Sequence, residues 1–89
     1  MLRIEYTSQF KRDFKKITKR PIEDILEVGH VISRLQQKKP LADKFVDHSL
    51  SGDWSGFRDC HIKPDLVLIY RVSGNSLQLA RIGSHSELF

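Results

Sequence analysis

The C-terminal half of the chain constrains the fold most, because three strand-like runs follow one another there with only short turns between them. The runs cover residues 57–62, 66–72 and 77–83. They are separated by Lys63-Pro64-Asp65 and Ser73-Gly74-Asn75-Ser76, which are rich in residues that favour chain reversal. Strands joined by such short turns pair antiparallel. The sequence therefore predicts an antiparallel sheet built by this half.

The N-terminal half predicts one strand and two helices. Residues 2–6 alternate apolar and polar side chains, as a half-buried strand does. Thr7 or Ser8 can then cap a first helix. Apolar side chains at helical spacing give this helix one buried face, namely Phe10, Phe14 and Ile17. Pro21 suits the first turn of a second helix, which stops at Pro40.

A long loop, residues 41–56, separates the second helix from the sheet, and we expect a short helical turn near its start. Loops of this length in compact domains often carry function. The predicted order is β-α-α-β-β-β, an α+β arrangement. We expect a single domain of residues 1–89, in which the N-terminal helical hairpin packs on one face of a mainly antiparallel sheet and the other face stays open.

The excess of basic residues favours anionic partners. Fifteen Lys and Arg residues face eleven Asp and Glu, for a net charge of +4 at pH 7. Nucleic acid, a ribosomal surface or an acidic protein would suit this charge, although simple solvation explains the lysines of the first helix equally well. The apolar runs are too short to cross a bilayer, and the one cysteine, Cys60, excludes an internal disulfide framework. We expect a cytoplasmic protein without membrane contact.

Strand alternation predicts ionisable side chains on the open face. Asp59 and His61 alternate with Cys60 and Ile62 along the first C-terminal strand. Side chains at alternate positions point to opposite faces of a sheet. Because Cys60 and Ile62 suit the core, Asp59 and His61 should face away from it. A further histidine, His48, lies in the long loop.

The last strand extends this pattern. Leu77, Leu79 and Arg81 occupy alternate positions and should share one face. If the extended chain continues beyond Gly83, His85 falls on that face as well. Arg81 and His85 would then point together from one edge of the sheet.

Two kinds of chemistry use such groups. Metal binding is poorly supported, because the spacing of His48, His61 and His85 matches no common zinc pattern, and we expect neither a metal nor another cofactor. RNA cleavage needs only a base for the 2′-hydroxyl, an acid for the leaving oxygen and cations for the phosphate. Histidine can serve as acid or base near neutral pH, and arginine can clamp a phosphate. Taken alone, each histidine is more simply a surface or hydrogen-bonded residue.

One stretch resembles a known family. Residues 47–70, DHSLSGDWSGFRDCHIKPDLVLIY, are similar to the signature of YafQ-type toxins of the RelE/ParE superfamily, and so are the opening IEYT and the ending RIGSHSELF. The resemblance covers essentially the whole chain and implies a RelE-like fold. It implies the toxin of a bacterial type II toxin–antitoxin pair, which cuts mRNA in the ribosomal A site without a metal. Its partners would be the ribosome, mRNA and an acidic antitoxin.

Carried onto this sequence, the resemblance implies a catalytic set of His48, His61, Asp65 and His85. His85 would be the general acid and His48 or Asp65 the base, with His61 positioning groups or stabilising charge. The substrate-contacting side chains would be Arg81, Phe89, Asp59 and Trp54. Arg81 would clamp the scissile phosphate, Phe89 would stack on a base, and Asp59 would support the site. For Trp54, packing under its own loop is an equal alternative.

Two alternative functions stay open at this point. Members of the same superfamily use the fold for other ends, so the chain could bind the ribosome or an antitoxin without cleaving RNA. A ParE-like member would instead act on a topoisomerase. The sequence does not assign acid and base among His48, Asp65 and His85, and it does not give the codon preference.

Overall fold

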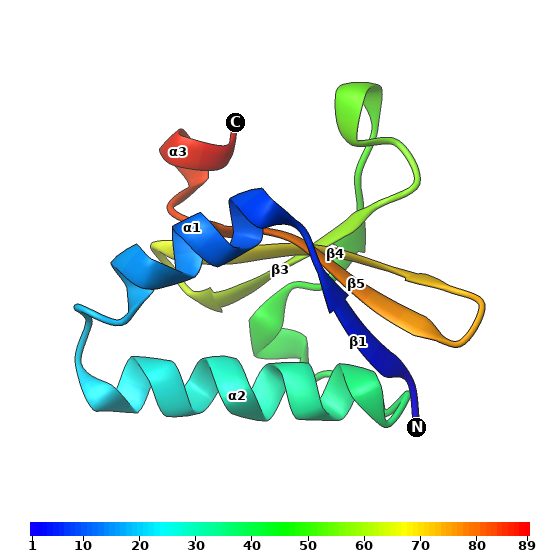
Figure 1. Cartoon of the computed structure of the whole chain (residues 1–89), viewed down its shortest axis with the longest axis horizontal. Helices are drawn as coiled ribbons and strands as arrows, with labels where there is room; N and C mark the ends of the chain where they lie inside the picture. The colour runs from blue at the N-terminus through cyan, green and yellow to red at the C-terminus, as the bar shows by residue number, and fades with distance from the viewer.

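A five-stranded sheet organises the computed structural model, which describes all of residues 1–89. The strand order is β1-β5-β4-β3-β2, with β1 parallel to β5 and every other neighbouring pair antiparallel. The elements follow one another as β1 (Arg3–Tyr6), α1 (Ser8–Ile17), α2 (Ile22–Gln36), η1 (Asp43–Phe45), β2 (His48–Ser49), η2 (Gly52–Trp54), β3 (Arg58–Lys63), β4 (Leu66–Ser73), β5 (Ser76–Gly83) and α3 (His85–Leu88), where η marks a short 3₁₀ helix. The expected α+β class with a mainly antiparallel sheet is confirmed (Figure 1).

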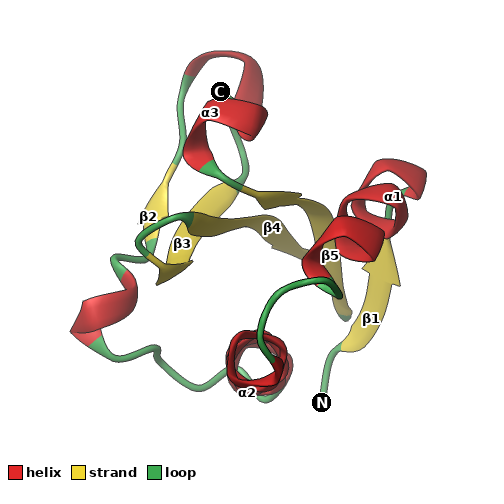
Figure 2. Cartoon of the chain, turned by 90° about the vertical axis from the view of Figure 1, so that its left-hand side faces the viewer, coloured by secondary structure: helices red, strands yellow, loops and turns green.

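The two long helices begin where their N-terminal signals predict. The Phe10 amide donates a hydrogen bond of 2.9 Å to the Thr7 hydroxyl, so Thr7 caps α1. Pro21 directly precedes α2, where its fixed φ and missing N–H do no harm. Figure 2 shows α2 beneath the sheet and α1 beside β1 and β5. A bilayer span would need a longer and more apolar helix than any that this chain forms.

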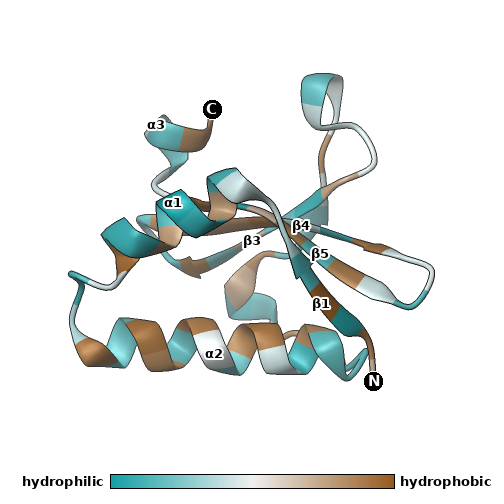
Figure 3. Ribbon diagram, viewed as in Figure 1, coloured by the Kyte–Doolittle hydropathy of each residue, from teal (hydrophilic) through white to brown (hydrophobic).

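The main core lies between the helices and one face of the sheet. α2 contributes Val28, Val31 and Leu35, and β3 contributes Cys60 and Ile62. Figure 3 shows hydrophobic residues recurring along α2 and along the middle strands. The predicted inward orientation of Cys60 and Ile62 is therefore confirmed. Burial raises the pKa of Cys60 to about 12, so its thiol stays neutral and unreactive.

The opposite sheet face is partly covered, which corrects the expectation that it stays open. A smaller buried cluster lies there, made of Val67, Ile69, Ala80 and Leu88. Leu88 reaches the sheet from α3. The loop that carries η2 stands on the same face and packs three partly buried side chains against the cluster: Leu50, Trp54 and Phe57. In Figure 1, α3 and this loop rise from the sheet on the side away from α2.

The sequence predicts that the chain stays extended as far as His85, and this prediction is wrong. The chain turns instead into α3, which begins at His85. The reason is local: the Ser84 hydroxyl accepts a hydrogen bond from the Glu87 amide, and the Glu87 carboxylate accepts one from the Ser84 amide. This reciprocal capping box starts a helix at His85. The long loop also contains a short strand, β2, which the sequence did not predict and which pairs with β3.

A β-bulge in β5 corrects the predicted facing of Arg81. Ile69 pairs with Arg81 and Tyr70 pairs with Leu79, so Ala80 is an extra residue in β5. Leu79 faces the main core, whereas Arg81 lies opposite Ile69 of the smaller cluster. The bulge therefore turns Arg81 to the same sheet face as α3, away from the face of Leu79.

Candidate functional site

Three of the predicted site residues meet where β2 pairs with β3. His48 lies opposite Asp59 in the register, and Asp59 and His61 are two positions apart on β3. The Nδ1 atom of His48 lies 2.9 Å from the Val46 carbonyl oxygen and 3.0 Å from Oδ1 of Asp59. The rings of His48 and His61 are 6.3 Å apart between centroids, with 30° between their planes. The predicted common face of Asp59 and His61 is confirmed by their pairing with Ile69 and Val67 of the smaller cluster.

These neighbours determine the tautomer of His48. Both atoms close to Nδ1 are oxygen acceptors, so Nδ1 carries the hydrogen and donates it to the Val46 carbonyl. In the neutral ring the bare nitrogen is then Nε2. The His48 side chain is 50% exposed, so this nitrogen is open to a ligand that approaches the sheet face. His48 is therefore arranged to accept a proton at Nε2.

Asp59 is an unusual neighbour for this histidine because its side chain is only 3% exposed. Its Oδ1 lies within ion-pair distance of His48 but receives no hydrogen bond, since the single Nδ1 hydrogen points at Val46. A buried carboxylate without a hydrogen bond is costly unless a positive charge lies close to it. Asp59 therefore places a buried carboxylate oxygen against the His48 ring, 3.0 Å from Nδ1.

The residue before His48 ties this loop to the core strands. The carboxylate of Asp47 accepts hydrogen bonds from the Tyr70 hydroxyl (2.6 Å) and from Nε of Arg58 (3.2 Å). Burial and the neighbouring carboxylate raise the pKa of Tyr70, which keeps its hydroxyl protonated as a donor. Val46 adopts a positive φ of 48°, which is strained for a β-branched residue. The sequence gives no signal for the contact between Asp47 and Tyr70, which are 23 positions apart.

The other half of the site stands on α3. The rings of His85 and Phe89 lie 4.8 Å apart between centroids, and both side chains are exposed. Leu88, between them in sequence, anchors α3 in the smaller cluster. The helix thus presents His85 and Phe89 together to solvent above the sheet.

The sheet register relates the two halves. Val67 pairs with His61 on one side and with Gly83 on the other, so these residues form one line across β3, β4 and β5. Two strand spacings separate His61 from Gly83 by about 10 Å. Gly83 leads through Ser84 to His85 on the same face of the sheet. His61 and the start of α3 therefore lie on one sheet face, with a gap of two strand spacings between them.

Arg81 is already partnered in this structure. Its Nε and Nη2 donate to the carboxylate of Asp13 on α1, at 2.8 and 3.2 Å. Asp13 also accepts hydrogen bonds from the Ile82 amide and from Gln9. Burial acts to raise the pKa of Asp13, but these hydrogen bonds outweigh burial and hold that pKa below its usual value. The hydrogen bonds to Asp13 in turn raise the pKa of Arg81. A guanidinium has five N–H donors, so Arg81 keeps donors for a phosphate.

Asp65 stands apart from the histidines in its contacts. It lies in the turn between β3 and β4, as predicted, and its carboxylate accepts two hydrogen bonds from Arg20, at 2.9 and 3.2 Å. No hydrogen bond or ion pair joins Asp65 to a histidine. The Arg20 hydrogen bond lowers the pKa of Asp65, which makes this carboxylate a weak proton acceptor. Of the two bases left open by the sequence, the geometry favours His48.

Trp54 packs within its own loop, the alternative that the sequence left open. Its ring meets the ring of Phe57 edge to face, with 5.3 Å between centroids. Both rings rest against the smaller cluster. The aromatic pair therefore shapes one wall of the sheet face that carries the histidines.

Comparison with known proteins agrees with this site. Residues 2–89 match the family model described as a bacterial toxin of a type II toxin–antitoxin system, YafQ. The "mRNA interferase toxin YafQ" of Escherichia coli is 37% identical over 87 residues, which cover 97% of this chain and 94% of the relative. Its structure in the E. coli DinJ–YafQ complex is 36% identical and superposes with a TM-score of 0.87, covering 100% of this chain and 99% of that one.

A Helicobacter pylori relative has been crystallised as a copper-bound L66S mutant toxin. It is 45% identical, covers both chains completely and superposes with a TM-score of 0.92. In the chain described here, no group of three or more His, Cys, Asp or Glu side chains is placed to hold a metal ion, so we derive no step through a metal. The match over residues 2–89 and the identities above 30% show the family. This chain belongs to the YafQ family of toxins from bacterial type II toxin–antitoxin systems.

Proposed function

We propose that this chain is an endoribonuclease that cleaves mRNA in the ribosomal A site and so inhibits translation. The observation that carries the proposal is the arrangement at His48, whose Nδ1 hydrogen is held by Val46 so that Nε2 is free to accept a proton. The name of the E. coli relative, an mRNA interferase, gives the substrate class. The net charge of +4 suits an RNA substrate and the ribosome.

The reaction uses the 2′-hydroxyl of the substrate as its nucleophile. Nε2 of His48 takes the hydroxyl proton while the 2′-oxygen forms a bond to phosphorus. The buried carboxylate of Asp59, 3.0 Å from Nδ1, stabilises the imidazolium that results. The ring of His61 lies beside that of His48, so His61 is a polar neighbour of the 2′-hydroxyl that His48 deprotonates.

The leaving group departs on the other side of the gap. As the bond between phosphorus and the 5′-oxygen breaks, His85 gives its proton to that oxygen. The products are a 2′,3′-cyclic phosphate and a 5′-hydroxyl; His48 has gained one proton and His85 has lost one, and exchange with solvent restores both rings. The N–H donors of Arg81 that Asp13 does not use can stabilise the charged phosphate, and Phe89 can stack on a neighbouring base.

We also propose that an acidic antitoxin neutralises the chain. The E. coli relative has been crystallised with the antitoxin DinJ. A basic toxin whose site lies on an exposed sheet face can be silenced by a negatively charged segment that covers it. The antitoxin would then compete directly with RNA for the same positive surface.

The test is cleavage of a defined mRNA on programmed ribosomes, read by primer extension. The variant His85→Ala should lose cleavage by about 10²- to 10⁴-fold, because a general acid contributes that much. His30→Ala is the matched control, since His30 is an exposed histidine of α2, on the other side of the sheet. Equal cleavage by His85→Ala and His30→Ala would refute the proposal. Growth arrest without cleaved transcripts would instead indicate a toxin that only binds its target.

A further inference from the structure

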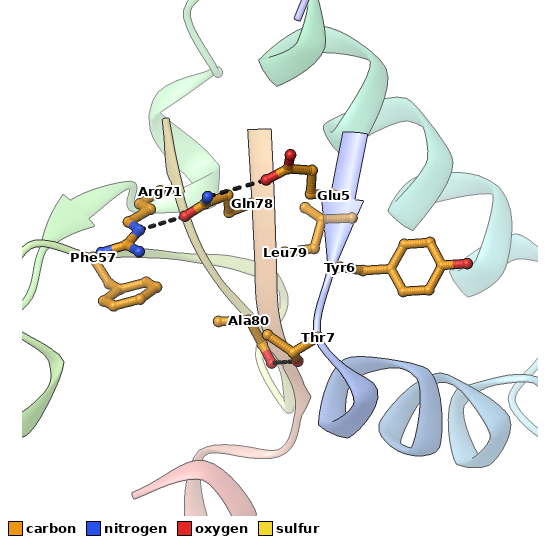
Figure 4. A pocket seen from close by; sticks show the side chains of 8 residues that line it. All are labelled: Glu5, Tyr6, Thr7, Phe57, Arg71, Gln78, Leu79 and Ala80. Carbon is orange, nitrogen blue, oxygen red and sulfur yellow. Dashed lines mark hydrogen bonds between the residues drawn. The ribbon is translucent and has the colours of Figure 1, made fainter. Parts of the chain in front are cut away.

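We propose that a pocket beside β1, β5 and β4 is a subsite for one nucleobase of the same RNA strand, an inference that rests on the proposed function. The pocket has a volume of about 270 Å³ and is formed by eight residues: Glu5, Tyr6, Thr7, Phe57, Arg71, Gln78, Leu79 and Ala80. Figure 4 shows a row of polar side chains along it, ending at an aromatic ring. Apart from Phe57, which borders the sheet face of the histidines, none of these residues belongs to the site described above.

The polar row is a ladder of hydrogen bonds across three strands. Glu5 pairs with Gln78 in the register of β1 and β5, and Gln78 pairs with Arg71 in the register of β5 and β4. Nε2 of Gln78 donates to Oε1 of Glu5 at 3.1 Å, and Nε of Arg71 donates to Oε1 of Gln78 at 2.5 Å. The three side chains therefore hold one another in place on the sheet surface.

The chemistry of the ladder fixes its polarity. A guanidinium can only donate hydrogen bonds and a carboxylate can only accept them, so the amide of Gln78 has one possible orientation between Arg71 and Glu5. The second carboxylate oxygen of Glu5 receives no hydrogen bond from the protein. That oxygen is an acceptor for a base that carries an exocyclic amino group, such as adenine or cytosine. Uracil has no such amino group.

The aromatic end of the pocket suits stacking. The guanidinium carbon of Arg71 lies 4.6 Å from the centroid of the Phe57 ring. Trp54 packs edge to face on the same ring and so helps to fix the orientation of Phe57. Arg71 is exposed, so a base can stack on its planar guanidinium. An RNA base offers both the flat face and the amino group that these residues recognise.

The pocket lies on the path of a strand bound at the histidines. Val67, Ile69 and Arg71 alternate along β4 and face the same side, and Val67 is the cross-strand neighbour of His61. Four residues of strand separate Val67 from Arg71 by about 13 Å. A few nucleotides span this distance. An RNA whose scissile phosphate lies between the histidines can therefore place a neighbouring base in the pocket.

The test measures binding without cleavage. Hexanucleotides built wholly of deoxyadenosine or deoxyuridine lack the 2′-hydroxyl, so they cannot be cut by the proposed reaction. Titrated into ¹⁵N-labelled protein, the adenine hexamer should shift the side-chain N–H signals of Arg71 and Gln78. Arg71→Ala should weaken its binding by about 5- to 100-fold, the effect of losing one stacked base. Arg34→Ala removes the same charge from α2 on the opposite side and should change binding less than 2-fold.

Two further variants sharpen the test. Arg71→Lys keeps the positive charge but loses the planar group, so it should also weaken binding. If this variant binds with wild-type affinity, Arg71 acts only through its charge and the subsite is overturned. Glu5→Ala should abolish the preference for the adenine hexamer over the uracil hexamer. The proposal is equally overturned if Arg71→Ala weakens binding no more than Arg34→Ala does, or if an acidic antitoxin peptide shifts the pocket signals while the hexamers do not. If the wild-type chain binds the hexamers in this pattern but does not cleave mRNA, the proposed function is refuted and the subsite is not.

Discussion

The two halves of the site are held in opposite ways. His48 and His61 lie on β2 and β3, where two polar contacts join the loop to the core strands. Asp59 lies 3.0 Å from Nδ1 of His48, and Asp47 accepts a hydrogen bond from the Tyr70 hydroxyl. His85 and Phe89 stand on a four-residue helix that one leucine, Leu88, anchors to the sheet. The comparison teaches that the fold prepares the tautomer of the expected base, through the contact of Nδ1 with the Val46 carbonyl. The position of His85, the expected acid, is set only by the capping box of α3 and by the apolar contact of Leu88.

Removing the carboxylate under His48 should have the largest effect. Asp59→Asn takes away the negative charge that stabilises the imidazolium, so single-turnover cleavage should fall about 10²-fold or more. The fold should persist, because Oδ1 of Asp59 makes no hydrogen bond that asparagine would break. Circular dichroism checks the fold. Asp43→Asn, an exposed aspartate of η1, is the control, and matching cleavage rates for the two variants would show that the carboxylate does not prepare His48.

Loosening α3 should have a smaller effect on the rate. Leu88→Ala removes the contact that seats the helix, so His85 loses its position and cleavage should fall about 10-fold. Leu35→Ala in the main core is the matched control, because Leu88 and Leu35 are 7% and 8% exposed. Both variants should lose roughly 2–3 kcal/mol of unfolding free energy, measured by urea denaturation. If Leu35→Ala slows cleavage as much as Leu88→Ala, the loss reflects stability and not the position of His85.

The smallest expected effect concerns the junction between α1 and β5. The hydrogen bonds of Asp13 hold its pKa below that of an unfolded chain, so their contribution to stability is present above about pH 4 and is lost as the pH falls through the folded value. Asp13→Asn removes this dependence. The wild type should therefore lose more unfolding free energy than Asp13→Asn between pH 5 and pH 2, read from urea midpoints. Parallel pH curves would show that the pair of Asp13 and Arg81 does not set the acid stability.

Regular elements were predictable because their side-chain period is short and uniform. The alternation of Asp59 and His61 with Cys60 and Ile62 held, although the pairing of β3 with β4 shifts register between His61 and Lys63. The apolar stripe of α1 and its Thr7 cap held as well, whereas Ile22 and Leu26 of the stripe predicted for the second helix are exposed. The capping box at Ser84 and Glu87 is also readable in the sequence, as a serine followed three residues later by glutamate, whereas strand alternation alone predicts extended chain there.

The missed features depend on contacts between distant residues. The bulge at Ala80 reverses the face of Arg81, and nothing in the local pattern of β5 marks the extra residue. Arg81 and Asp13 are 68 positions apart, and Arg20 and Asp65 are 45 apart. Such pairs form only when helices dock on the sheet, so periodicity cannot find them. They nevertheless decide how free Arg81 is to bind phosphate and how weak a base Asp65 is.

The sequence by itself determined the class of fold, the inward face of β3 and the set of chemical groups available, because these follow from local periodicity and residue type. Tertiary structure alone decided the tautomer and the surroundings of the groups that we propose for proton transfer. The tautomer of His48 comes from a strained turn at Val46, and its charge partner Asp59 is buried by the pairing of β2 with β3. The physical reason is that hydrogen-bond partners and solvent exclusion set the behaviour of an ionisable group, and both arise only when separate segments pack together.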